Sequence, residues 1–337
     1  MKLASMRVEI IGAGVVGLTV AFELARQGAG QGLEVELVER QPQAGLGCSR
    51  FAGGMIAPWC ELESAEPIVA TLGAEALAFW TKDIPVATIA GSLVVAPARE
   101  RAELIDFSRR AQNFEELDAT GVARLEGDLA GRFDNALYFA REAHLDPKVA
   151  MAELGARLAQ TPNVTLRFGA IAWGDADWTV DCRGFAARDE LAELRGVKGE
   201  MLTLRSNDLT LSRPVRMLHP KRPVYVVPRG DGLFMVGATM IENEEAARVT
   251  ARSVVELINS AYAIHPAFAE AEIVEMGSDV RPAFPDNLPR ITRRGQTLYI
   301  NGLYRHGFLL APALARRAAR VVLEGAWFPE VCDAHSS

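Results

Sequence analysis

The chain has 337 residues, of which 49% are hydrophobic and 23% charged, and its formal net charge at pH 7 is −7. This length allows a sizeable core and predicts two domains, and the acidic balance without a basic block argues against a nucleic-acid partner. Four scattered cysteines (Cys48, Cys60, Cys182 and Cys332) form no C-x-x-C pair, which argues against a zinc site or a disulfide framework and favours a reducing compartment.

The N-terminal apolar stretch does not have the pattern of a signal peptide or a membrane span. Glu9 and Glu23 lie within or beside it, and glycines interrupt it. We therefore expect a cytoplasmic protein without a membrane partner.

The first predicted elements form a nucleotide-binding motif, "RVEIIGAGVVGLTVAFELARQG". A β-branched run from Val8 to Ile11 precedes Gly12-x-Gly14-x-x-Gly17, and an apolar helical pattern follows. A second strand, "LEVELVER", ends at Glu39, 22 residues after Gly17. This order predicts a tight turn, close approach of the backbone to a pyrophosphate at the helix N-terminus, and a carboxylate that accepts from ribose hydroxyls.

A loop of small residues follows where a pure NAD domain would be expected to continue with its next βαβ unit. Residues 45–63, "GLGCSRFAGGMIAPWCELE", contain Ser49, Gly53 and Gly54, and such small side chains leave room for a large flat ligand. The alternative is a flexible glycine-rich loop.

The rest of the chain alternates between the two expected domains. Residues 65–135 contain helical stretches and the apolar strand "GSLVVAP", and a helix is predicted to begin after Asp146-Pro147. "NVTLRF" and "WTVDCRGF" are typical of strands in the nucleotide-binding sheet. From "GEMLTLRS" to "DVRPAF", alternating strands and one helix, "RSVVELINSAYAIHP", predict a large antiparallel sheet beside the cofactor.

These motifs together resemble the D-amino-acid oxidase superfamily of FAD enzymes, most closely its glycine oxidase branch, over nearly the whole chain. The resemblance rests on "GAGVVGLTVAFEL", "AGGMIAP", "VDCRGFAARDELAELRGVKGEML", "YVVPRGDGLFMVGATM", "DVRPAFPDNLPRI" and "NGLYRHGFLLAPALA". The first motif is shared by many flavoproteins, whereas the last three in this order are more specific. The implied fold is α/β, with a Rossmann-like FAD-binding domain (1–60, 140–205 and 286–337) interleaved with a substrate domain on a large antiparallel sheet (61–139 and 206–285).

The resemblance implies a site that combines a carboxylate clamp with bound FAD. Arg281 is the expected clamp, because a guanidinium grips a carboxylate through two parallel hydrogen bonds; Tyr225 shares the carboxylate, Met240 lines the pocket and Arg305 lies near substrate and flavin. The predicted cofactor-binding residues are Gly12, Gly14, Val15, Val16, Gly17, Glu39, Arg40, Cys48, Ser49, Gly53, Gly54, Met55, Ala170, Gly302, Leu303, Tyr304, Arg305, His306, Gly307, Phe308 and Leu309. For Arg281, Tyr225 and Met240 the alternatives are a surface arginine, a half-buried strand tyrosine and ordinary core packing.

The implied reaction is the oxidation of glycine or a similar small amino acid, with dioxygen as acceptor and hydrogen peroxide as product, for thiazole formation in thiamine biosynthesis. No metal is expected, since the five histidines (His144, His219, His265, His306 and His335) follow no metal-ligand spacing. In the family that this chain resembles, the subgroup with covalently attached flavin uses a cysteine shortly before the final glycine motif. No cysteine lies between Cys182 and Cys332, so the resemblance implies noncovalent FAD. It also implies a homo-oligomer, since family members commonly form one. Two alternatives remain open: a D-amino-acid or sarcosine-type dehydrogenase with a non-oxygen acceptor, and a non-catalytic flavin-binding redox sensor or partner subunit.

Overall fold

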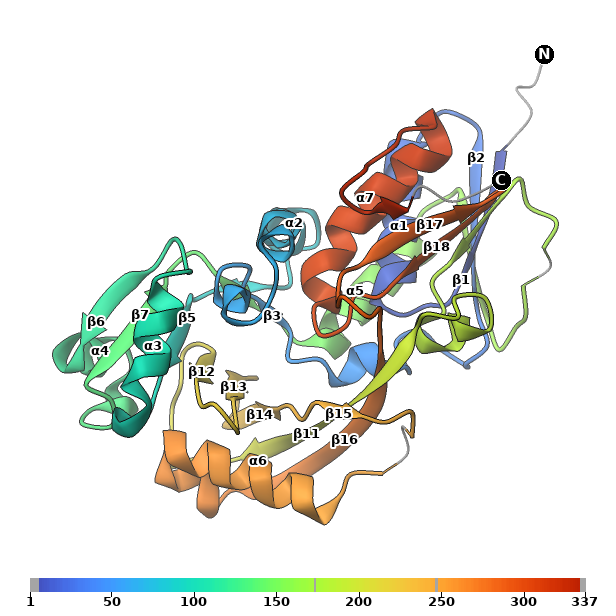
Figure 1. Cartoon of the computed structure of the whole chain (residues 1–337). Helices are drawn as coiled ribbons and strands as arrows, with labels where there is room; N and C mark the ends of the chain where they lie inside the picture. The colour runs from blue at the N-terminus through green and yellow to red at the C-terminus, as the bar shows by residue number, and fades with distance from the viewer. Residues whose placement is uncertain (1–5, 173, 246–247, 334–337) are drawn as a thin grey trace.

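The computed structural model describes residues 6–172, 174–245 and 248–333, which form two large sheets joined by a smaller one (Figure 1). Within this part of the chain, the first sheet has seven strands in the order β19-β17-β18-β10-β1-β2-β9. Its strands are β1 (Met6–Ile11), β2 (Leu33–Glu39), β9 (Val164–Phe168), β10 (Trp178–Asp181), β17 (Arg290–Arg294), β18 (Thr297–Asn301) and β19 (Cys332–Asp333).

The strands from β9 to β18 in this sheet are parallel, and β17 is antiparallel to β18. The side chains of β1, β2, β10 and β18 are mostly buried on both faces, as expected for a parallel sheet covered by helices, whereas those of the edge strand β9 are half-buried or exposed. The covering helices are α1 (Val15–Gln27), α5 (Pro147–Ala159) and α7 (Gly307–Glu324), and α2 (Pro67–Ala78) packs on α7. Asp146 caps α5 by accepting from the Lys148 and Val149 amides, as the Asp-Pro pair predicted.

The second sheet has nine described strands and is almost entirely antiparallel. Its path runs β15-β11-β14-β13-β12-β5-β7-β6, with β16 paired along β11, and only the β12–β5 pairing is parallel. The strands are β5 (Ser92–Val95), β6 (Glu115–Asp118), β7 (Asn135–Phe139), β11 (Arg195–Arg205), β12 (Val215–Met217), β13 (Val224–Pro228), β14 (Leu233–Gly237), β15 (Ile241–Glu242) and β16 (Glu272–Ala283).

Three helices accompany the second sheet. Helix α6 (Ala251–Ile264) lies along β11, β13 and β14 (Figure 1), and buries Leu257, Ala261 and Ile264 in the sheet's apolar cluster. Helices α3 (Arg101–Ser108) and α4 (Ala119–Leu125) lie at the β6–β7 end of the sheet. The predicted combination of a Rossmann-like sheet and a large antiparallel sheet is therefore confirmed.

Short elements connect the two sheets. A three-stranded sheet is formed by β3 (Met55–Ile56), β8 (Ala143–His144) and β4 (Thr88–Ile89). The remaining helical turns are η1 (Cys48–Phe51), η2 (Cys60–Glu63), η3 (Phe79–Asp83), η4 (Ala98–Glu100), η5 (Gly127–Leu129), η6 (Gly184–Asp189) and η7 (Pro266–Ala269). Strand β11 falls in the range 140–205 that the sequence assigned to the FAD-binding domain, yet it pairs with β14 and β16 of the second sheet. The domain boundaries stay a prediction.

Candidate functional site

A cavity of about 700 Å³ runs along the carboxyl ends of the parallel strands. Ligands of open α/β sheets bind at this edge, and the volume is in the range of small-molecule and cofactor sites. The predicted cofactor residues that line it are Gly12, Gly14, Val15, Val16, Glu39, Arg40, Cys48, Ser49, Ala170, Leu303, Tyr304 and Gly307.

The glycine turn between β1 and α1 is shaped by close backbone contacts. Gly12 has φ +101°, and a Cβ atom on it would lie 2.8 Å from the carbonyl oxygen of Cys182. A Cβ atom on Gly17 would lie 1.8 Å from the carbonyl oxygen of Gly12. Gly17 therefore serves helix–strand packing behind the cavity, whereas Gly14 is on its wall.

Two helices begin at the cavity wall. Neither Gly14, the N-cap of α1, nor His306, the N-cap of α7, makes a side-chain cap hydrogen bond, in contrast to Asp146 of α5 and Thr250 of α6. The hydroxyl of Ser49 lies 3.2 Å from the Val15 amide and accepts from it. Apart from the Val15 amide, which Ser49 satisfies, these helix N-termini leave backbone N–H donors and positive partial charge for an anionic ligand such as a pyrophosphate.

Glu39, at the end of β2, lines the cavity and accepts hydrogen bonds from two backbone amides. Its Oε2 accepts from the Ala13 amide at 2.8 Å, and its Oε1 accepts from the Gln41 amide at 2.9 Å. The carboxylate therefore fixes the glycine turn and retains lone pairs for a ribose hydroxyl. Residues of this cavity thus have the space, the donors and the acceptor that FAD requires.

The other predicted cofactor residues lie away from the lining of this cavity. Gly54 has φ +67° and accepts at its carbonyl from the Leu145 amide, and Gly302 has φ +75° and faces Phe284. Met55 packs against the apolar cluster that contains Met201. Phe308 and Leu309 are buried in the core of the first sheet. Their predicted roles at the flavin stay predictions.

A second, smaller pocket of about 80 Å³ brings the four predicted catalytic residues together. Its lining consists of Glu63, Ser64, Arg216, Pro223, Val224, Tyr225, Ala238, Met240, Arg281 and Arg305. The two spaces are neighbours, because Val280 and Pro282 of β16 line the larger cavity while Arg281 between them lines the smaller pocket. They also meet at Tyr304, which lines the larger cavity and whose hydroxyl donates to the sulfur of Met240 in the smaller pocket.

Arg281 is a partly buried cation whose described hydrogen bond goes to a carbonyl oxygen. Its Nη1 donates to the Thr239 carbonyl at 3.0 Å, and within the described residues no carboxylate forms an ion pair with it. Burial lowers the pKa of this guanidinium, although an arginine remains charged in proteins. A buried cation without an anionic partner is costly, so the arrangement suits an anionic ligand.

Glycines surround Tyr225 and make room for its ring. A Cβ atom on Gly53 would lie 2.6 Å from Cε2 of Tyr225, and one on Gly237, its partner in the β13–β14 ladder, would lie 2.8 Å from the hydroxyl. Gly53 therefore contacts a predicted substrate residue. The phenol lines the smaller pocket, where it can donate to a bound carboxylate.

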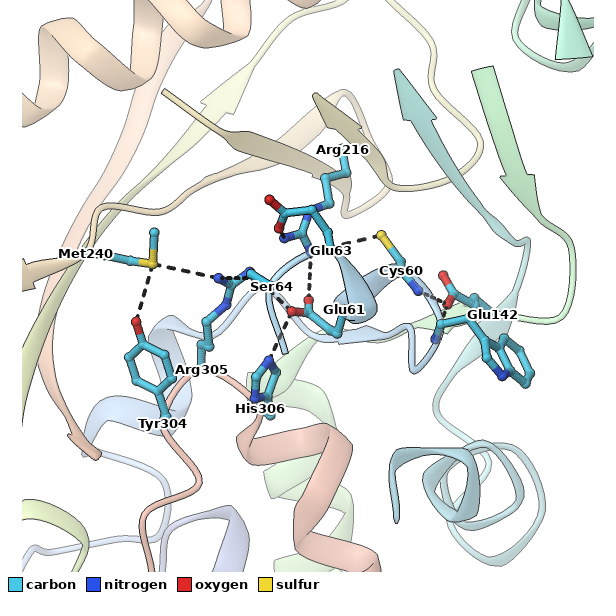
Figure 2. A network of polar contacts seen from close by, with 11 residues as sticks. Cys60, Glu61, Glu63, Ser64, Glu142, Arg216, Met240, Tyr304, Arg305 and His306 are labelled. Carbon is cyan, nitrogen blue, oxygen red and sulfur yellow. Dashed lines mark hydrogen bonds and ion pairs between the residues drawn. The ribbon is translucent and has the colours of Figure 1, made fainter. Parts of the chain in front are cut away.

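Behind the pocket, Glu61 holds three partners (Figure 2). Its carboxylate lies 3.0 Å from Nη1 of Arg216, 3.2 Å from Nη2 of Arg305 and 3.0 Å from Nε2 of His306. Burial alone would raise the pKa of this carboxyl, but Arg305 and Arg216 hold it well below its ordinary value. Burial lowers the pKa of His306, so the imidazole is neutral beside an ionised Glu61.

The remaining contacts of Arg305 lead to the pocket wall. Its Nη1 lies 3.2 Å from Oγ of Ser64 and 3.7 Å from the Met240 sulfur, to which the Tyr304 hydroxyl also donates at 3.4 Å (Figure 2). Met240 is 49% exposed, which does not fit the core-packing alternative.

Sequence reasoning missed Glu61, Glu63, Arg216 and Thr239. It also missed Gly199, on which a Cβ atom would lie 2.1 Å from Nη2 of Arg281. The two glutamates stand in "CELES", directly after the "AGGMIAP" motif, and this proximity was the available signal. Their partner Arg216 is about 150 residues further along the chain, as 155 and 153 positions separate the pairs. No local pattern connects them.

Comparisons with known proteins give the family and the fold of this chain. Residues 7–321 match the family model DAO, described as FAD dependent oxidoreductase. The ThiO protein of Rhizobium etli, provisionally named a thiamine biosynthesis oxidoreductase, is 52% identical over 328 residues, covering 96% of this chain and 99% of that protein. The glycine oxidase of Pseudomonas putida is 27% identical, with 92% of each chain covered. A crystal structure of glycine oxidase from Geobacillus kaustophilus superposes with a TM-score of 0.81 at 22% identity, covering 99% of this chain and 100% of that chain.

The described residues include neither a candidate metal centre nor a helix that could span a membrane. No group of three or more histidine, cysteine, aspartate or glutamate side chains is arranged to hold a metal ion there. Within the same residues, no helix has both the length and the apolar character needed to cross a membrane.

Proposed function

This chain belongs to the family of FAD-dependent oxidoreductases, and from that membership we propose that it oxidises glycine or a similar small amino acid. The observation that carries the proposal is Arg281, a partly buried guanidinium without a carboxylate partner in the described structure, in a pocket beside the cavity that suits FAD. A small pocket with one such cation fits a small monocarboxylate. The names of the ThiO relative and of the glycine oxidases support the same substrate class.

In this proposal the residues of the chain bind and orient, and FAD supplies the two-electron acceptor when bound. Arg281 grips the substrate carboxylate, and the Tyr225 hydroxyl donates a further hydrogen bond to it. Met240 bounds the pocket, and Arg305, held by Glu61 and Ser64, adds positive charge close to the reacting group. Fixing the carboxylate at one end directs the α-carbon and amine toward the cavity, and such positioning is a large part of catalysis.

The proposed overall reaction requires neither a metal ion nor a strong acid or base among the side chains. Glycine loses two electrons and two protons to become the imine, and water hydrolyses the imine to glyoxylate and ammonia. Dioxygen takes up the two electrons and two protons and becomes hydrogen peroxide. The similarity to ThiO supports a role for the imine in thiazole formation for thiamine biosynthesis.

The test is anaerobic mixing of the purified holoenzyme with glycine, sarcosine and small D-amino acids while the flavin absorbance is followed. Bleaching by glycine supports the proposal, and reoxidation by dioxygen with stoichiometric hydrogen peroxide distinguishes an oxidase from a dehydrogenase that needs a quinone. A flavin that no member of the panel bleaches would contradict the proposal and favour a non-catalytic flavoprotein.

A further inference from the structure

Besides Arg281 and Arg305, the smaller pocket contains a third guanidinium, that of Arg216, which already pairs with two carboxylates. Arg216 is 3% exposed, its Nη1 lies 3.0 Å from Oε1 of Glu61, and its Nη2 lies 2.6 Å from Oε2 of Glu63 (Figure 2). Both glutamates come from η2, so one short turn supplies both partners. Arg216 and Arg281 line the same pocket, but only Arg281 lacks a carboxylate partner among the described residues.

The charges around this pocket leave one net positive charge. Three guanidinium groups, those of Arg216, Arg281 and Arg305, line the pocket, and the two carboxylates of Glu61 and Glu63 pair with Arg216 and Arg305. A ligand with one carboxylate therefore neutralises the group, and a ligand with two would add an unmatched negative charge. Like charges at short distance in a partly buried site are unfavourable.

Of the two carboxylates, Glu63 is the one suited to controlling the ligand's charge. Glu61 is shared among Arg216, Arg305 and His306 and its side chain is 12% exposed. Glu63 forms its described ion pair with Arg216 alone, is 27% exposed and lines the pocket. Its removal would free one edge of the Arg216 guanidinium toward the pocket and leave Glu61 in place.

We propose that Glu63 is a specificity-determining residue that restricts this site to substrates with a single carboxylate, by occupying Arg216 and repelling a second anionic group. The inference rests on the proposed function in one respect: the first carboxylate is held at Arg281. Specificity of this kind uses a repulsive element as well as an attractive one.

The experiment measures binding rather than turnover, with ligands that cannot be oxidised at an amine. Acetate and malonate, which adds a second carboxylate to acetate, are titrated into the holoenzyme while the flavin absorbance is followed. Glu63→Gln should raise the affinity for malonate relative to acetate by about tenfold or more. Glu66→Gln is the matched control, because Glu66 carries the same charge in the same segment but is exposed and outside the pocket.

Three results would overturn the proposal. These are an unchanged malonate-to-acetate ratio in Glu63→Gln, an equal change in Glu66→Gln, and a gain that persists when Arg216→Met is added to Glu63→Gln. If Glu63→Gln does not yield holoenzyme, Glu63→Asp replaces it, because the side chain that is shorter by one methylene withdraws the carboxylate from Arg216. The affinity for malonate relative to acetate must then rise in Glu63→Asp as well. Neither acetate nor malonate is a substrate, so their affinities can be measured whether or not the protein oxidises glycine. A lack of glycine oxidation would count against the proposed function alone.

Discussion

Gly199 lies directly against the guanidinium group of Arg281. A Cβ atom on residue 199 would stand 2.1 Å from Nη2 and 2.2 Å from Cζ of Arg281. Gly199 is in the middle of β11, and Arg281 is on β16, the strand paired along it. The absence of a side chain at position 199 is therefore what allows Arg281 to occupy its place in the smaller pocket.

The first prediction concerns this contact. Gly199→Ala should displace the guanidinium and lower kcat/KM for glycine by roughly 10- to 100-fold, since a misplaced binding group costs about this much. FAD content should stay the same, because Gly199 is not part of the larger cavity. Gly155→Ala, at a helical position where a Cβ atom meets open space, is the control. Unchanged kinetics in Gly199→Ala would mean that Arg281 can move without loss, which argues against its proposed role.

The second prediction concerns Arg281 itself. Arg281→Ala should lower kcat/KM for glycine by roughly two orders of magnitude or more, because a hydrogen bond to a charged group is worth about 1.5–3 kcal/mol and a bidentate pair more. Arg281→Lys should recover only part of the activity, since an ammonium cannot copy the fork. Steady-state kinetics are compared with those on a similar amine without a carboxylate, whose rate should be insensitive to the change. Equal losses on both substrates, or loss of flavin, would instead favour Arg305 as the clamp.

Much of the nucleotide-binding half could be predicted from sequence because its signals are local. The glycines, the strand before them and Glu39 after them lie within one continuous stretch, and the Asp146-Pro147 pair marks the start of α5 by its own chemistry. Such features depend on neighbours a few residues away, so periodicity and capping residues are sufficient to find them.

The surroundings of the pocket could not be predicted in the same way. Arg281 and Tyr225 were found through motif resemblance, but Gly199 beside Arg281 depends on the register of β11 and β16. Likewise, the pairing of Glu61 with Arg305 joins residues 244 positions apart. Register and long-range ion pairs are properties of the packed molecule, and a single sequence without aligned relatives contains no signal for them.

The third prediction concerns Glu39. Glu39→Ala should weaken FAD binding by about 1–3 kcal/mol, because the carboxylate is proposed to hold the ribose and its loss also frees the Ala13 and Gln41 amides that it now accepts from. The measurement is FAD titration of the apoprotein, and activity should return at saturating FAD. Glu34→Ala removes the same charge from an exposed position of the same strand and should leave the affinity unchanged. Equal FAD affinity in Glu39→Ala and the parent protein would remove Glu39 from the site.

The fourth prediction is that FAD is held without a covalent bond. Cys48 and Cys182 both line the larger cavity, but burial raises the pKa of the Cys48 thiol to about 12 and that of Cys182 well above its ordinary value. The nucleophilic form of cysteine is the thiolate, so both are unreactive at neutral pH. Acid precipitation of the yellow protein should leave the flavin in the supernatant. Flavin that stays with the pellet would refute this expectation.

The last prediction concerns Glu142, a fully buried carboxyl behind the turn that carries Glu61 and Glu63. Its Oε1 accepts from the amides of Trp59 and Cys60 at 2.9 and 2.8 Å. Burial raises the pKa of Glu142 from 4.5 to about 8, and the neighbouring Glu61 charge acts in the same direction. Between pH 4.5 and about pH 8, Glu142 therefore keeps its proton in the folded protein and loses it in the unfolded chain.

The sign of the effect follows from proton linkage. A raised carboxyl pKa contributes stability that is fully present below the unfolded value of 4.5 and is lost as the pH rises through the folded value of about 8. Glu142→Gln keeps an oxygen for the two amides and removes the titration. Thermal unfolding of the FAD-saturated proteins should therefore give a Tm that falls more steeply between about pH 5 and about pH 8.5 for the parent protein than for Glu142→Gln. Parallel Tm curves would mean that Glu142 ionises without cost and does not hold this turn through a neutral carboxyl group.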